Sequence, residues 1–131
     1  MRYLLLALLM GILAGCSGGG GVTHRPPKEI IVGQPATLHV AFTVWGSGSG
    51  DLAKRYTTII CHYRKTGEAE YHQVPARIIT SDQYQMAVDF VIPPQEATKN
   101  FDSLEYYFDF LFDGVANREG INTVRIVAPG K

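Results

Sequence analysis

The chain consists largely of short stretches in which hydrophobic and polar residues alternate, the pattern of a β-strand with one buried face. The longest runs from residue 104 to 113, and its apolar side chains are Leu104, Tyr106, Phe108, Phe110 and Phe112. Because all of these are large, this segment is predicted to be a central strand of the core. The same alternation predicts strands over Ala36–Val44 and Tyr84–Ile92.

The remaining strands are predicted at Glu29–Val32, Tyr56–Arg64, Tyr71–Thr80 and Ile121–Ala128. Glycine and proline turn signals separate them, as at Gly33-Gln34-Pro35 and Thr66-Gly67, and no long helical pattern intervenes. About seven strands in roughly 100 residues predict an all-β fold, an immunoglobulin-like β-sandwich.

Tyr56–Arg64 and Tyr71–Thr80 are predicted to form a hairpin. Pairing Arg64 with Glu70 across it places His62 opposite His72. Such opposite-charge and aromatic pairs stabilise a ladder by ~0.2–1 kcal/mol each. Pro75 cannot donate to a central ladder, so the second strand is predicted to be an edge strand or to break there.

The amino terminus carries Arg2, an apolar run of about a dozen residues, and then Leu13-Ala14-Gly15-Cys16. The run is shorter than the ~20 residues that span a bilayer, and its length is typical of a signal peptide. The four residues ending at Cys16 resemble the lipobox of bacterial lipoproteins. The resemblance implies cleavage before Cys16 and acylation of that residue, hence attachment to a lipid bilayer. The alternative is an ordinary secretory signal with Cys16 near the cut.

Three regions are therefore expected: a signal peptide at 1–15, a lipidated Gly/Pro-rich tether at 16–27, and the sandwich domain at 28–131. Fully extended, the 11 residues Ser17–Pro27 would reach about 35 Å, enough to hold the domain clear of the lipid headgroups. His24 lies in this tether and is expected to be solvated. Ser17 stands where an aspartate would resemble the inner-membrane retention signal, so the resemblance favours the outer membrane.

Charge and cysteine content narrow the functional classes. Twelve basic residues balance twelve acidic ones, so no basic excess supports nucleic-acid binding. Once Cys16 is acylated, Cys61 is the only thiol left, and no disulfide is expected within the domain. Cys61 is predicted to face inward as a small, unreactive hydrophobe.

A series of short motifs runs through the predicted domain: His62-Tyr63-Arg64, Gly67, Val74, Tyr84, Ile92-Pro93, Leu104-Glu105-Tyr106-Tyr107 and Asp113-Gly114. Together they resemble the structural motifs of fibronectin type III and related immunoglobulin-like modules of bacterial surface proteins. The resemblance implies that Tyr106 is a tyrosine-corner residue whose hydroxyl bonds to nearby backbone. It implies nothing about chemistry, because such folds carry many functions.

Candidate chemistry is sparse. His62 and His72, if they face each other, are weak candidates for a metal site that would still lack a third ligand. Glu105, Asp109 and Asp113 share a strand face, and their carboxylates are either a pair for glycoside chemistry or the strand's solvated side. We expect no catalytic residue, no cofactor and no enzymatic activity.

Binding is the remaining class. In this topology the loops Trp45–Lys54, Ser81–Gln83 and Gly114–Gly120 are expected at one end. Trp45 is the leading candidate contact, with polar contacts from Asp51 and Arg118; alternatively, Trp45 caps the core. We expect a membrane-anchored envelope lipoprotein that binds another envelope protein as an accessory or assembly subunit. The alternative is a glycan- or peptidoglycan-binding module that uses Trp45.

Overall fold

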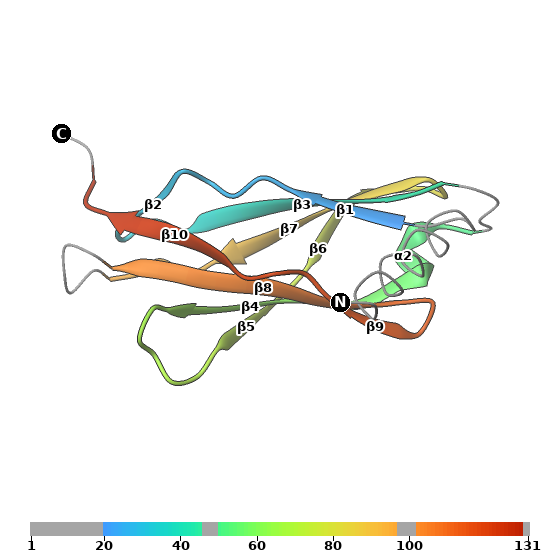
Figure 1. The fold of residues 1–131 in the computed structure, drawn as a ribbon. Coiled ribbons are helices and arrows are strands. Elements are labelled where there is room, and N and C mark those ends of the chain that lie inside the picture. Colours follow the sequence, from blue (N-terminus) through green and yellow to red (C-terminus); the bar gives the residue numbers. More distant parts are fainter. Residues whose placement is uncertain (1–19, 46–49, 97–101, 130–131) are drawn as a thin grey trace, which may run out of the picture.

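The computed structural model describes residues 20–45, 50–96 and 102–129, which form two packed β-sheets (Figure 1). The first sheet has the order β1-β3-β7-β6, with β1 (Gly20–His24), β3 (Ala36–Val44), β7 (Gln85–Ile92) and β6 (Arg77–Ser81). The second has the order β2-β10-β8-β4-β5, with β2 (Glu29–Ile31), β10 (Asn122–Val127), β8 (Ser103–Phe112), β4 (Tyr56–Lys65) and β5 (His72–Pro75). A further strand, β9 (Val115–Arg118), also pairs with β8, and a single helical turn, α2 (Leu52–Arg55), precedes β4.

This strand order confirms the predicted immunoglobulin-like sandwich. β1, β3, β7 and β6 correspond to strands A, B, E and D, and β10, β8 and β4 to G, F and C. The first strand is split: β1 pairs antiparallel with β3, and β2 pairs parallel with β10 in the other sheet. Pro26 and Pro27 lie between the two halves, where the missing backbone donors suit a change of sheet.

The inward-facing residues of the alternating strands form the hydrophobic core. Leu104, Tyr106 and Phe108 of β8 are at most 1% exposed, and β8 is the predicted central strand, lying between β10 and β4. The predicted inward residues of β3 and of Gln85–Ile92 are buried as well; they are Leu38, Val40, Phe42, Val44, Met86, Val88, Phe90 and Ile92. Tyr84, predicted on the same inward face, is instead 58% exposed because it lies beyond the start of β7.

As predicted, the second strand of the hairpin is interrupted at Pro75. β5 belongs to the second sheet, and β6 starts two residues after Pro75 in the first sheet. Two short elements were not predicted. Most of the expected loop Gly114–Gly120 is β9, and Asp51 begins α2 by accepting a hydrogen bond from Ala53 N at 2.8 Å.

The predicted tether is wrong for Gly20–His24, which forms β1, so the sandwich begins before residue 28. This strand was not predicted because it begins with two glycines, and glycine is depleted in strands. Gly20 lies close to the other sheet: a Cβ added there would lie 2.5 Å from Tyr56 Oη, so the Tyr56 side chain would have to shift.

His24 fastens β1 to both sheets. Its Nδ1 lies 2.7 Å from the backbone oxygen of His39 in the first sheet, and its Nε2 lies 2.6 Å from Tyr106 Oη in the second. Because a carbonyl only accepts, Nδ1 is the donor and, in the neutral ring, Nε2 accepts the hydroxyl proton of Tyr106. The expectation of a solvated His24 was therefore wrong. Tyr106 also departs from the tyrosine-corner expectation, because among the described residues its hydroxyl bonds this distant side chain.

Candidate functional site: the outer face of the second sheet

The outer face of the second sheet carries a connected group of aromatic and charged side chains, which we call the aromatic–ionic face. Its members are His62, Arg64, Tyr71, Glu105, Tyr107, Asp109 and Arg118. Strand alternation places it there: because Tyr106 and Phe108 point into the core, Tyr107 and Asp109 point outward.

Tyr107 is the centre of this face. His62, its cross-strand partner on β4, stacks on it with ring centroids 4.7 Å apart and planes at 12°. The guanidinium of Arg118 lies 4.5 Å from the Tyr107 ring centroid. The ring of Tyr71 packs against that of Tyr107 in a T-shaped arrangement, with ring centroids 5.0 Å apart and planes at 73°. Two tyrosines, a histidine and an arginine thus form one contiguous surface.

Asp109 holds the cations in position. Arg118 donates to it through Nε at 2.7 Å and Nη2 at 3.0 Å, a bidentate pair. His62 Nε2 lies 3.0 Å from Asp109 Oδ2, the oxygen that also accepts from Arg118 Nη2. The hydrogen bonds from Arg118, followed by its charge and that of His62, hold the pKa of Asp109 below its ordinary value. The carboxylate is therefore ionised at neutral pH.

A second ion pair continues the face. Arg64 Nε donates to Glu105 Oε1 at 3.1 Å, and its guanidinium lies 4.4 Å from the centroid of Tyr71. Arg64 Nη1 also donates to the backbone oxygen of Glu68 at 3.0 Å. Both arginines are thus oriented by a carboxylate and a tyrosine before any partner arrives.

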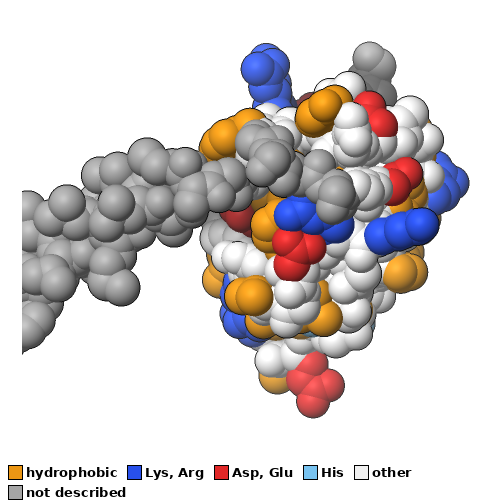
Figure 2. Space-filling model, turned by 90° about the vertical axis from the view of Figure 1, so that its right-hand side faces the viewer, with side chains coloured by type: hydrophobic (Ala, Val, Ile, Leu, Met, Phe, Trp, Pro, Cys, Tyr) orange, Lys and Arg blue, Asp and Glu red, His pale blue; other side chains and the backbone are white. Residues whose placement is uncertain are grey.

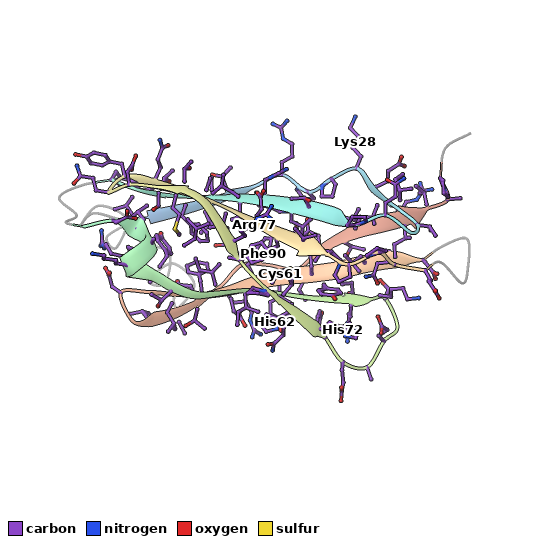
Figure 3. The ribbon with its side chains drawn as sticks, turned by 180° about the vertical axis from the view of Figure 1, so that it is seen from behind. Lys28, Cys61, His62, His72, Arg77 and Phe90 are labelled. Atoms are coloured by element: carbon purple, nitrogen blue, oxygen red, sulfur yellow. The ribbon has the colours of Figure 1, made fainter. Side chains whose placement is uncertain are left out.

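The predicted metal pair is not formed, because the predicted hairpin register was wrong by one residue. His62 pairs with Gln73, and His72 pairs with Tyr63. A one-residue shift sends side chains to opposite faces. Figure 3 shows His62 and His72 on separate parts of the hairpin. Within residues 20–45, 50–96 and 102–129, no three His, Cys, Asp or Glu side chains gather as metal ligands.

The three carboxylates considered for glycoside chemistry are all bound to cations. Asp109 and Glu105 pair with Arg118 and Arg64, and Asp113 accepts from Arg55 Nη2 at 2.7 Å. The Arg55 hydrogen bond lowers the pKa of Asp113. A glycosidase acid needs a raised pKa, so the shifts of Asp109 and Asp113 have the wrong sign for that role.

Cys61 is fully buried, as predicted, and lies between the sheets in Figure 3. Burial raises the pKa of its thiol to about 12, so the reactive thiolate is nearly absent at neutral pH.

Two of the three predicted loops meet at one end, where the Asp113-Gly114 turn also lies, and we call this region the loop end. The rest of the third predicted loop forms β9 and runs back along β8. Leu52 N donates to Asp82 O at 2.9 Å, and Asp113 N donates to Arg55 O at 2.9 Å. Val44 N likewise donates to Tyr84 O at 2.9 Å. The loop end comprises Val44–Trp45, Asp51–Arg55, Ser81–Tyr84 and Asp113–Gly114, together with the start of β1.

The predicted binding residues Trp45, Asp51 and Arg118 are not brought together. Trp45 is at the loop end, 54% exposed, so it does not cap the core. Asp51 is also there, but its side chain serves as the N-cap of α2, and the backbone N–H of Ala53 lowers its pKa. Arg118 belongs to the aromatic–ionic face, on the other sheet from β3, which Trp45 follows.

Sequence reasoning missed most of the aromatic–ionic face. Asp109 was predicted to share a strand face with Glu105, but the partners on this face depend on the true β4–β5 register and on the unpredicted strand β9. A signal for β9 exists in the pattern Asp109…Arg118, which a tight turn at Asp113-Gly114 brings into cross-strand register.

Neither the lipobox nor its cysteine can be placed in this geometry, because Leu13-Ala14-Gly15-Cys16 lies outside the described residues. In the described ranges, no helix is long and apolar enough to cross a membrane. No protein-family model matches the sequence, and a search of curated proteins likewise gives no match.

Proposed function

We propose that the protein is a non-enzymatic lipoprotein of the bacterial envelope that holds another envelope protein through its aromatic–ionic face. The observation that carries the proposal is the pairing of Tyr71 and Tyr107 with Arg64 and Arg118 on one exposed sheet face. Tyrosine and arginine are enriched among the residues that dominate protein–protein binding energy. The lipobox-like motif ending at Cys16 supports the membrane attachment, and Ser17 after it favours the outer membrane.

The preformed geometry favours a protein partner. Ordering a long side chain at an interface costs about 0.5–1.5 kcal/mol. Arg64 and Glu105 are only 28% and 21% exposed and already paired, so little of this cost remains to be met on binding. The paired charges leave the face close to neutral, which suits a partner that contributes its own apolar and polar groups.

The face can be tested by site-specific photo-crosslinking in intact cells. A photoreactive amino acid is placed at Gln73 or Thr123, which are exposed and cross-strand neighbours of His62 and Glu105. The control position is Thr37, exposed on β3 in the other sheet. We expect Gln73 and Thr123 to crosslink to one defined envelope protein and Thr37 to give no such product. Equal crosslinking from both sheets would contradict the proposal.

The affinity for the crosslinked partner provides the quantitative test. Replacing Tyr107 by Ala removes the central ring and should weaken binding about 30-fold, roughly 2 kcal/mol. His39→Ala is the matched control, because His39 is 78% exposed on the opposite sheet. Unchanged affinity in a folded Tyr107→Ala protein would rule out this face.

Glycan binding through Trp45 is the second candidate, favoured by the exposure of that ring. It is the weaker one, because Asp51 is engaged in the helix cap and Arg118 lies on the other sheet. Trp45 therefore lacks the polar neighbours that were expected to bond sugar hydroxyls. Another role for this ring follows from the few residues that separate Cys16 from β1 in the sequence.

A further inference from the structure

Few residues separate Cys16 from the sandwich in the sequence. β1 begins at Gly20, so only Ser17–Gly19 lie between the cysteine and the first strand. Four residue steps span at most about 14 Å when fully extended. The headgroup layer of one leaflet is itself about 5–8 Å thick. If Cys16 is acylated, as proposed above, the start of β1 cannot stand far from the lipid surface.

The start of β1 belongs to the loop end. Gly20 pairs with Val44, the last residue of β3, and packs against Tyr56 at the start of β4. The other end of the molecule carries the turn at Gly33 and the last residue of β10, Val127. In Figure 1 the strands run lengthwise between these two ends, with α2 marking the loop end. Short attachment at Gly20 therefore turns the loop end toward the membrane.

Two large aromatic side chains are exposed there. Trp45 and Tyr84 are 54% and 58% exposed, and the hydrogen bond from Val44 N to Tyr84 O places the chain segments that carry them side by side. The Trp45 ring lies next to Gly21 of β1: a Cβ added to this glycine would lie 3.5 Å from Trp45 Cζ3. Figure 2, which views this end, shows separate hydrophobic side chains interspersed with charged ones. Tryptophan and tyrosine are the residues enriched where proteins meet the membrane–water interface.

The charges of the loop end argue against electrostatic attraction to anionic lipid headgroups. Asp51 caps α2, Asp82 accepts from Tyr84 N at 2.7 Å, and Asp113 pairs with Arg55. Lys54 is exposed, but no cluster of basic residues accompanies it among the described residues of this end. Contact with lipid would therefore depend on the aromatic rings and on the acyl chains, and not on anionic headgroups.

We propose that the loop end is a membrane-contact surface: Trp45 and Tyr84 seat in the headgroup region of the bilayer in which Cys16 is anchored. This proposal rests on the lipid attachment proposed above. The sandwich then stands with its strands directed away from the membrane. The aromatic–ionic face, which lies along the side of the molecule, is presented laterally to a partner in the same membrane.

Trp45 is the only tryptophan of the chain, so its fluorescence reports on this surface alone. The full-length protein, produced with its signal peptide in a bacterial host, is reconstituted into phosphatidylcholine vesicles with or without dibrominated acyl chains. We expect Trp45 emission to shift to shorter wavelength on these vesicles and to lose intensity when the lipid is brominated. The effect should persist in high salt, since no charge attraction contributes.

Two variants sharpen the test. Trp45→Phe combined with Gln34→Trp moves the fluorophore to an exposed turn at the opposite end, where bromolipid should not quench it. Insertion of twelve Gly/Ser residues after Ser17 lengthens the attachment and should reduce quenching of Trp45. Equal quenching at positions 34 and 45, or no quenching at 45, would overturn the proposal and leave the loop end to another macromolecule.

Co-flotation with the vesicles separates the two proposals. A protein that floats only when Cys16 is present, yet shows no quenching of Trp45, would overturn the membrane contact and leave the lipid attachment intact. A wild-type protein that fails to float, like its Cys16→Ser variant, would overturn the attachment and the contact together.

Discussion

At the scale of single residues, His24 shows most clearly how sequence position can mislead. It follows a run of glycines and precedes Pro26-Pro27, the composition of a linker, yet its ring joins the two sheets. The edge of the same ring packs on Phe108, at 5.1 Å between centroids. Local composition carries no information about a partner 82 residues away, and the expected tyrosine corner came from the family resemblance alone.

Removing this connection should destabilise the fold. His24→Ala leaves the buried Tyr106 hydroxyl unpaired, which costs about 1–3 kcal/mol. Tyr106→Phe removes the hydroxyl, so it should cost less in the His24→Ala background than in wild type. Urea unfolding of both single variants and the double variant measures this coupling.

The control is His39→Ala, a histidine of the neighbouring strand whose exposed ion pair with Asp89 should be worth under about 1 kcal/mol. Strictly additive effects of His24→Ala and Tyr106→Phe would mean that the hydrogen bond between them contributes nothing.

At the scale of elements, alternation identified the long strands but not how they pair. β3, β7 and β8 were predictable because each buries every second residue against one core. The β4–β5 register was not, because the connection from Thr66 to Tyr71 is too long for a tight turn to fix it. β1 and β9 escaped notice for a related reason: they are short edge strands with little apolar content.

The β8–β9 hairpin offers a pH-dependent test of the aromatic–ionic face. Arg118 depresses the pKa of Asp109 in the folded protein, so the unfolded chain binds this proton at higher pH. The resulting stabilisation is complete above the unfolded pKa of about 3.9 and is lost as the pH falls through the lower folded value.

Asp109→Asn should therefore lower the free energy of unfolding at pH 7 and weaken its decline below pH ~4. The measurement is urea unfolding at a series of pH values. Glu70→Gln, at an exposed turn carboxylate, is the control and should leave the acid limb unchanged. An acid limb in Asp109→Asn identical to that of wild type would show that the Arg118 pair makes no contribution.

At the scale of the whole molecule, two surfaces have different orientations relative to the strands. The loop end is perpendicular to the strand direction and carries Trp45 and Tyr84, whereas the aromatic–ionic face is parallel to it. A three-residue connection from Cys16 would assign the first to the bilayer and the second to a neighbouring protein. The fold was predictable from sequence, but this division was not, because the tether appeared to run to residue 27 and allowed the domain any orientation.

Both proposals place the protein at a membrane through the proposed acylation of Cys16, which mass spectrometry of the native protein's amino-terminal peptide measures directly. The expected result is a mature chain that begins at Cys16 and carries the mass of a diacylglycerol and a further acyl group. An unmodified Cys16, or a chain cleaved at any other residue, would contradict the account.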